Sequence, residues 1–160
     1  MSAVRVVWAR EVIPGGVPTI FLAGPTPRRS GVKSWRPEMI QAIEDGWHDD
    51  DLVVLTPELN GPWDGDGDAQ FEWETMARSR ADVILFWLWR DLDTLPGFTT
   101  NVEFGLDAPT GKVVLGAPPD CPNPERNNYL VRIAKLLGVP VCTTLEGTAD
   151  LAVAMLQDRR

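Results

Sequence analysis

The chain has little of several residue types on which common enzyme mechanisms depend. Its 160 residues include one histidine, His48, and two cysteines, Cys121 and Cys142, which form neither a CxxC pair nor a Cys/His metal spacing. A disulfide framework is therefore not expected, and a Ser-His-Asp mechanism would have to use His48, which stands in the polar stretch 46–50. No apolar run approaches the ~20 residues of a membrane span, and the first residues lack a signal-peptide pattern. We expect reduced thiols and a cytoplasmic protein.

Basic residues are also scarce. Lys and Arg number 15 against 23 Asp and Glu, which gives a net charge of −8 at pH 7. A chain this acidic repels polyanions, so a nucleic acid polymer is not an expected partner. Residues 44–74 hold no Lys or Arg, and within them residues 64–68 alternate Asp with Gly. That run lacks the sixth-position glycine and twelfth-position glutamate of an EF-hand, so we expect a solvated loop and no metal.

Short apolar runs alternate with helix-length segments along the chain. The runs are apolar throughout, which is typical of strands buried on both faces of a parallel sheet: 19–23, 52–55, 83–87, 112–116 and 139–142. Helices are expected at 34–46, 69–80, 100–108, 125–137 and 145–157. The alternation predicts a flavodoxin-like, doubly wound, five-stranded parallel sheet in a three-layer α/β/α arrangement, with strand order 2-1-3-4-5. We expect residues 1–18 to form an N-terminal extension or edge hairpin and residues 19–158 a single domain.

The loop after the first run is a candidate ligand-binding segment, because ligands of doubly wound sheets bind at the carboxyl ends of the strands. It is neither a Walker A motif nor GxGxxG, so no nucleoside triphosphate or nicotinamide cofactor is indicated. Two interpretations stay open, a solvated turn and a loop that holds an anionic or sugar-bearing ligand. The glycine and basic residues of this loop include Gly24, Arg28, Arg29 and Lys33.

The stretch before the fourth run holds the sharpest candidate, Glu103. Thr100 and Glu103 have the spacing of a helix capping box, in which both side chains would bind backbone N–H groups. Alternatively, Glu103 points into the cleft at the carboxyl edge, near Thr99 and Asn101, and acts as a nucleophile on an anomeric carbon. Glu74 likewise has two interpretations. Its carboxylate either interacts favourably with the dipole at the start of a helix or faces a ligand.

Four stretches together resemble the nucleoside 2-deoxyribosyltransferase-like family, and best a small bacterial and phage branch of it. They are 21–25, 73–74 with 81–84, 97–105 and 111–114. The resemblance spans about residues 19–150. It implies a flavodoxin-like fold, homo-oligomers with active sites near subunit interfaces, and cleavage of the N-glycosidic bond between a nucleobase and a sugar.

The same resemblance assigns roles to individual residues. It places the nucleophile at Glu103 and base recognition at Glu74, where the family has aspartate. A second family aspartate falls near Asp91 and Asp93 without a clean match to either. The catalytic residues expected are therefore Glu103 and Glu74, with no cofactor. The expected substrate-binding residues, which include an aromatic wall around Trp87, are Ala23, Gly24, Pro25, Arg28, Trp87, Gly97, Thr99, Thr100 and Asn101.

The expected function is transfer of a (deoxy)ribosyl group from a nucleoside or nucleotide to another base. One alternative is an N-glycoside hydrolase, since sequence does not show whether water or a base accepts the sugar. Arg28, Arg29 and Lys33 could bind a 5′-phosphate, which would favour a nucleotide substrate. Another alternative is a non-catalytic module that binds a nucleotide or an ADP-ribose-type ligand.

Overall fold

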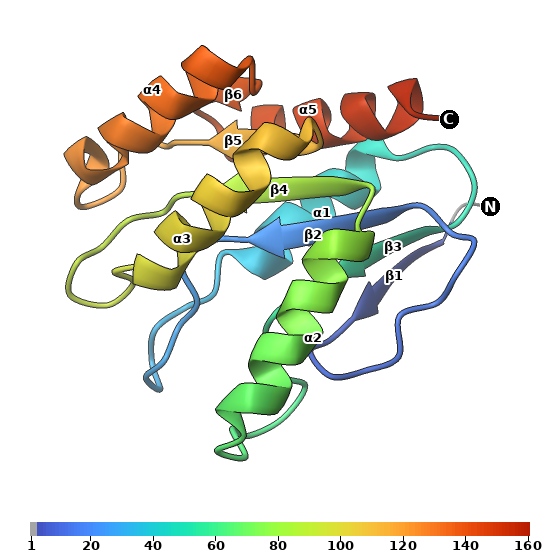
Figure 1. Ribbon diagram of the computed structural model, residues 1–160, viewed down its shortest axis with the longest axis horizontal. Coiled ribbons are helices and arrows are strands. Elements are labelled where there is room, and N and C mark those ends of the chain that lie inside the picture. The colour runs from blue at the N-terminus through green and yellow to red at the C-terminus, as the bar shows by residue number, and fades with distance from the viewer. Residues whose placement is uncertain (1–2) are drawn as a thin grey trace.

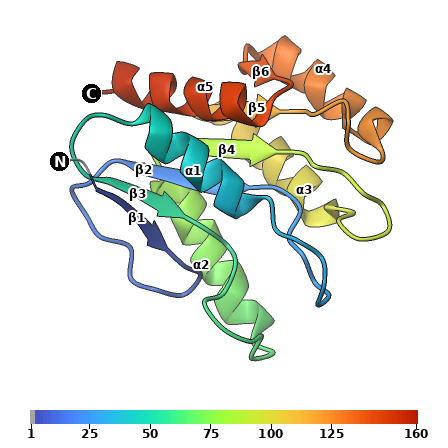
Figure 2. The same ribbon diagram turned by 180° about the vertical axis from the view of Figure 1, so that it is seen from behind.

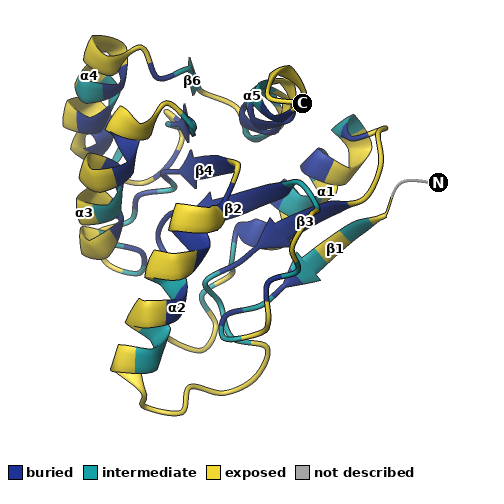
Figure 3. Ribbon diagram, turned by 45° about the vertical axis from the view of Figure 1, so that its right-hand side comes forward, coloured by how far each residue is buried: buried dark blue, intermediate teal, exposed yellow. Residues whose placement is uncertain are grey.

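The computed structural model describes residues 3–160, which form one six-stranded parallel sheet between two helical layers (Figures 1 and 2). The strands lie in the order β1-β3-β2-β4-β5-β6. Their bounds are β1 (Val4–Val7), β2 (Thr19–Ala23), β3 (Leu52–Leu55), β4 (Val83–Trp87), β5 (Val113–Gly116) and β6 (Val141–Cys142). Every residue of β2, β3, β4 and β5 is buried, as the apolar runs predict for strands covered on both faces. Figure 3 shows this for β2, β3 and β4.

The helices divide between the two faces of the sheet. One face is covered by α1 (Arg36–Gly46) and α5 (Leu145–Asp158). The other is covered by α2 (Gly67–Arg80), α3 (Phe98–Asp107) and α4 (Asn128–Leu137). Two short 3-10 turns, η1 (Ala108–Thr110) and η2 (Pro124–Asn127), adjoin α3 and α4. Within residues 3–160, no helix combines the length and the apolar character needed to cross a membrane.

The flavodoxin-like fold and the predicted order of the five strands are confirmed, and a sixth strand adds to them. Of the two forms predicted for the N-terminal segment, an extension or an edge hairpin, the hairpin is not observed, because β1 pairs parallel to β3 at the edge of the same sheet. The connection from β1 to β2 is packed rather than turned tightly: Ile13 is buried, and the Trp73 indole donates a 2.9 Å hydrogen bond to the Glu11 carbonyl. Met1 and Ser2 lie outside the described residues.

Candidate active site

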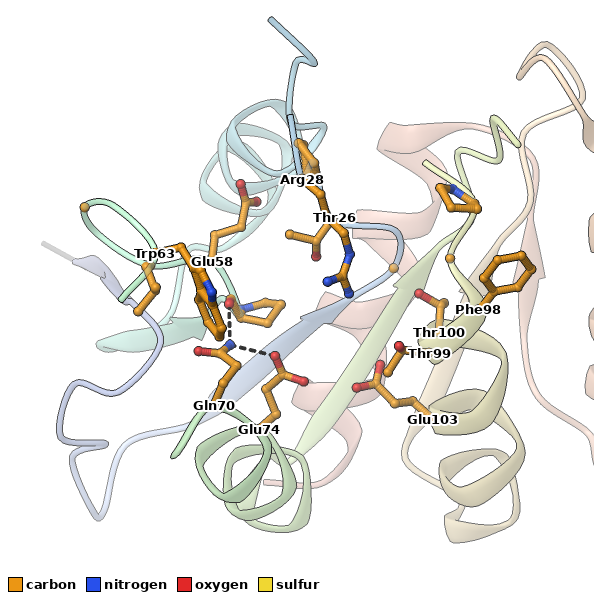
Figure 4. A pocket seen from close by; sticks show the side chains of 17 residues that line it. Thr26, Arg28, Glu58, Trp63, Gln70, Glu74, Phe98, Thr99, Thr100 and Glu103 are labelled. Atoms are coloured by element: carbon orange, nitrogen blue, oxygen red, sulfur yellow. Dashed lines mark hydrogen bonds between the residues drawn. The ribbon is translucent and has the colours of Figure 1, made fainter. Parts of the chain in front are cut away.

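A cavity of about 780 Å³ opens at the carboxyl ends of the central strands. The edge is the one where doubly wound sheets bind their ligands. Four segments line the cavity: the loop after β2, the segment after β3, the first half of α2 and the beginning of α3 (Figure 4). Polar side chains that line it are Thr26, Arg28, Glu58, Gln70, Glu74, Thr99, Thr100 and Glu103.

Glu74 of α2 and Glu103 of α3 point toward one another across this cavity (Figure 4). The Glu103 side chain is 13% exposed. Burial, and next the negative charge of Glu74, raise the pKa of Glu103 to about 7, against the opposing charge of Arg78. A partly buried carboxyl whose pKa lies near neutrality, beside a second carboxylate inside a cavity, is typical of a catalytic site.

Gln70 holds Glu74 in place. Its side-chain amide donates to Glu74 Oε1 at 2.6 Å and to the Pro57 carbonyl at 2.8 Å. Gln70 and Glu74 are four residues apart on α2, so their side chains lie on one face of the helix. The amide thereby fixes the Glu74 carboxylate to the end of β3.

Of the two interpretations of Thr100 and Glu103, the capping box is wrong, because α3 begins two residues earlier than expected. Gly97 is the N-cap, in the left-handed conformation with φ 65°, and no side chain caps the helix. Thr100 is buried inside the first turn, and Glu103 comes one turn further along the helix. The Glu103 carboxylate is therefore left free to face the cavity.

Arg90 fixes the backbone that opens α3. This buried guanidinium donates through Nη1 to the Pro96 and Gly97 carbonyls at 2.6 and 3.0 Å, and through Nη2 to Asn101 Oδ1 at 2.8 Å. Its Nε donates to Asn127. Burial lowers the pKa of Arg90. Asn101 thus belongs to this supporting network, whereas Gly97 lines the cavity.

A second buried guanidinium, that of Arg36, holds the loop after β2. It donates to the Gly24 carbonyl through Nη2 and to Glu58 Oε2 through Nη1, both at 3.0 Å, and lies 4.5 Å from the Trp35 ring centroid. Burial lowers the pKa of Arg36, against the nearby charge of Glu58. Gly24 has φ 148°, and a Cβ there would lie 2.7 Å from the Trp35 ring and would contact the Trp87 carbonyl. Only glycine fits this bend of the chain.

The structure brings most of the expected site residues to the cavity, but not all of them. Those that line it are Gly24, Arg28, Glu74, Gly97, Thr99, Thr100 and Glu103. Ala23 is a buried strand residue, and Pro25 accepts the Trp35 indole N–H through its carbonyl; neither lines the cavity.

Trp87, around which the aromatic wall was expected, does not line the cavity. Its ring lies on the face covered by α1 and α5, against Gly116 of the neighbouring strand. The aromatic side chains that do line the cavity are Trp63 and Phe98. Trp63 belongs to the acidic loop before α2, where its ring centroid is 5.6 Å from the Arg10 guanidinium, which also binds Asp64 at 2.6 Å.

Neither Asp91 nor Asp93 supplies a second carboxylate to the cavity. Asp91 accepts hydrogen bonds from the Thr94 hydroxyl and the Asp93 N–H, which lower its pKa. Asp93 is exposed, and its nearest carboxylate oxygen is 4.0 Å from Arg29. The carboxylates that accompany Glu103 in the cavity are instead Glu74 and Glu58.

The fold and this carboxylate-lined cavity define a flavodoxin-like α/β protein with an acidic site at the carboxyl edge of its sheet. The sequence profile described as nucleoside 2-deoxyribosyltransferase like matches residues 17–121. The chain belongs to this family, and the matched region contains every residue that lines the cavity. No curated protein matches the chain. Family membership supports glycosyl transfer as the general activity.

Proposed function

We propose that the protein cleaves the N-glycosidic bond of a nucleoside or nucleotide and transfers the (deoxy)ribosyl group to another base. The observation that carries this proposal is the pair of carboxylates, Glu74 and Glu103, that face one another across the cavity. The cavity volume of about 780 Å³ falls within the ~300–1,000 Å³ of small-molecule sites. Its lining combines these carboxylates with an aromatic side chain, Trp63, and a guanidinium, Arg28.

In the proposed reaction Glu103 is the nucleophile. One of its carboxylate oxygens forms a bond to C1′ of the sugar, while the C1′–N bond breaks and its electron pair leaves with the base. A nitrogen of a second base then attacks C1′ of the glycosyl ester and releases the Glu103 carboxylate. If water attacks instead, the reaction is hydrolysis. The first step requires Glu103 to be ionised, so activity should rise as the pH passes through the raised pKa.

Glu74 and Trp63 are the proposed contacts for the base. The Glu74 carboxylate, fixed by Gln70, accepts a hydrogen bond from the base or carries the proton that the departing base takes up. Trp63, whose ring lines the cavity, provides the stacking surface that we expected from Trp87.

A second candidate, a nucleotide N-glycoside hydrolase, is supported by Arg28. Of the three basic residues expected to bind a 5′-phosphate, Arg28 lines the cavity. Arg29 instead bonds to the Asp93 carbonyl, and Lys33 pairs with Glu38 at 2.7 Å. Arg28 therefore presents a cation to the ligand space, as recognition of a phosphate requires.

The test is a product assay with and without Glu103. The protein and its Glu103→Gln variant are incubated with ribo- and deoxyribonucleosides and their 5′-monophosphates, with and without a second base, and products are identified by mass spectrometry. We expect base exchange by the wild type and at least ~1,000-fold less in Glu103→Gln, because the nucleophile is lost. Asp93→Asn, which removes an exposed carboxylate outside the cavity, is the matched control and should keep full activity.

Other outcomes separate the alternatives. Free sugar and free base would identify a hydrolase, and a preference for monophosphates that Arg28→Met removes would identify the nucleotide form. Equal inertness of the wild type and Glu103→Gln would overturn the enzymatic proposal and leave the binding module. Homo-oligomerisation and a cytoplasmic location stay predictions.

A further inference from the structure

Two charged residues lie between α2 and α3, behind the carboxylate pair. Arg78 comes one turn after Glu74 on α2, and Asp107 comes one turn after Glu103 on α3. Both are buried, with exposed fractions of 9% for Arg78 and 8% for Asp107. Neither lines the cavity, so neither can touch a substrate bound there.

Arg78 joins the two helices through a defined set of contacts. Its Nε donates to Asp107 Oδ2 at 2.7 Å, and its Nη2 donates to Asp107 Oδ1 at 3.4 Å. Its Nη1 lies 3.7 Å from Glu103 Oε1, a salt-bridge distance that is too long for a hydrogen bond. Asp107 therefore fixes the guanidinium, and the guanidinium stands beside Glu103 without closing on it.

We propose that Arg78 is a positioning residue that favours the ionised form of Glu103, and that Asp107 holds Arg78 back from a tight ion pair that would occupy the attacking oxygen. The proposal rests on the proposed function, in which Glu103 attacks as a carboxylate. Buried ion pairs are costly, because both charges lose their hydration. The cost of burying the Arg78 guanidinium beside the proposed nucleophile is explained if its positive charge stabilises the negative charge of Glu103.

The charged groups that face Glu103 come from both α2 and α3. From α2, Glu74 raises the pKa of Glu103 and Arg78 lowers it, whereas Asp107 on α3 itself raises it. Arg36 of α1 is a further cation: the negative charge of Glu103 acts to raise its pKa, although burial lowers that pKa overall. The pKa of Arg78 is raised, because the hydrogen bond to Asp107 and the nearby carboxylates outweigh its burial. Arg78 therefore stays charged throughout the range in which Glu103 titrates.

Three variants separate this role from simple packing. Arg78→Met keeps the apolar stem and removes the charge, so it should move the titration of Glu103 to higher pH by about 1 unit or more. Asp107→Asn removes an anion and frees Arg78 to approach Glu103, so it should move the titration to lower pH. Arg78→Lys keeps the charge and should stay closer to the wild type than Arg78→Met does. A residue that only packs would not shift the titration in opposite directions.

The measurement is the titration of the Glu103 carboxyl carbon by NMR. The protein is labelled with carbon-13 at glutamate Cδ, the Glu103 signal is identified by its absence in Glu103→Gln, and its midpoint is followed with pH in each variant. Equal midpoints in Arg78→Met and the wild type, or shifts of both charge-removing variants in one direction, would overturn the proposal. If Arg78→Met does not fold, a downward shift in Asp107→Asn supports the proposal and no shift overturns it.

This titration needs no substrate, so its failure is distinguishable from failure of the proposed function. Opposite shifts in a protein that turns over no nucleoside would keep the positioning role and discard the reaction. In an active protein, the acid limb of the kcat/KM profile should move with the NMR midpoint in each variant. The kcat of Asp107→Asn should fall although its Glu103 is more fully ionised, because the tight pair occupies the attacking oxygen.

Discussion

The two helical layers of this protein place different side chains where their helices meet. On one face, α1 and α5 pack through apolar residues such as Met39, Ile43 and Ala152, all with no exposed surface. On the other face, α2 and α3 are apolar toward the sheet, but the seam between them holds charged groups, among them Arg78 and Asp107. Apolar packing stabilises the fold without any charged partner, whereas a buried charge is tolerated only while it is paired. The layer of α1 and α5 therefore stabilises the fold, whereas α2 and α3 have charged groups in place of apolar packing where they adjoin the candidate active site.

The largest effect expected from this comparison is in the apolar layer, at Gly116. A Cβ at this position would contact the Trp87 ring and lie 2.5 Å from Thr148 Oγ1. Gly116→Ala should therefore lower the free energy of unfolding by roughly 3 kcal/mol, at the upper end of overpacking costs. Chemical denaturation of the variant measures this loss. An unchanged stability would show that this layer is loosely packed and would remove one side of the comparison.

A smaller and pH-dependent effect is expected in the charged seam, at Glu103. Its pKa is raised by burial and by Glu74 to about 7, from an ordinary 4.5, so the folded state keeps a proton that the unfolded state has already lost. The contribution of Glu103 to stability therefore falls as the pH rises from 4.5 to 7. Glu103→Gln cannot lose a proton, so its stability relative to the wild type should be greater at pH 8 than at pH 5, by on the order of 2 kcal/mol.

Denaturation at both pH values measures this difference. Glu72→Gln removes an exposed carboxylate of α2 and is the matched control, for which we expect the same small change at both pH values. A pH-independent effect of Glu103→Gln would contradict the raised pKa and weaken the case for a special carboxyl in the seam.

The sheet was predictable from sequence, because each central strand is a short, continuous apolar run, and such runs are typical of strands buried on both faces. The start of α3 was not predictable, because the Thr100–Glu103 spacing fits a capping box as well as it fits a Glu103 that faces the cavity. What decides against the box is the left-handed Gly97 and the hydrogen bonds from Arg90 to the preceding backbone. Those contacts join the end of β4 to the loop before α3, and no local pattern reports them.

For a similar reason, the sequence did not indicate which aromatic side chains line the cavity. The alternation that runs along β4 and into the two residues after it places Trp87 and Trp89 on one side of the sheet. Trp87 belongs to the core beneath α1 and α5, and the partly buried Trp89 packs against that core. Which face of the sheet lies next to the cavity depends on which face each connecting helix covers. That is decided by the whole fold and not by the sequence of β4. Trp63 reaches the cavity from a loop that Arg10, far away in sequence, holds through Asp64.

A third prediction concerns Trp63, which lines the cavity and belongs to neither of the two apolar cores that flank the sheet. Trp63→Ala should raise KM by about tenfold, since base–aromatic stacking contributes ~1–3 kcal/mol, and should leave stability within ~0.5 kcal/mol of the wild type. Steady-state kinetics and denaturation measure the two quantities. Phe71→Ala, which truncates an exposed aromatic of α2 that does not line the cavity, is the control. An unchanged KM in Trp63→Ala would assign base stacking elsewhere.

The smallest effect is expected on the outer surface of α3, at Gly105. This glycine is helical and exposed, with no atom within 4 Å of an added Cβ, so Gly105→Ala should stabilise the protein by about 0.5–1 kcal/mol. It adjoins Val102 and Leu106, which with Phe98 form an apolar stripe along the exposed side of the helix. Denaturation and light scattering test the prediction together. Stabilisation at unchanged mass is the expected result, whereas a loss of stability with a fall in mass would show that a second copy of the chain packs against Gly105. That outcome would add a third kind of helix surface to the comparison, one stabilised by association.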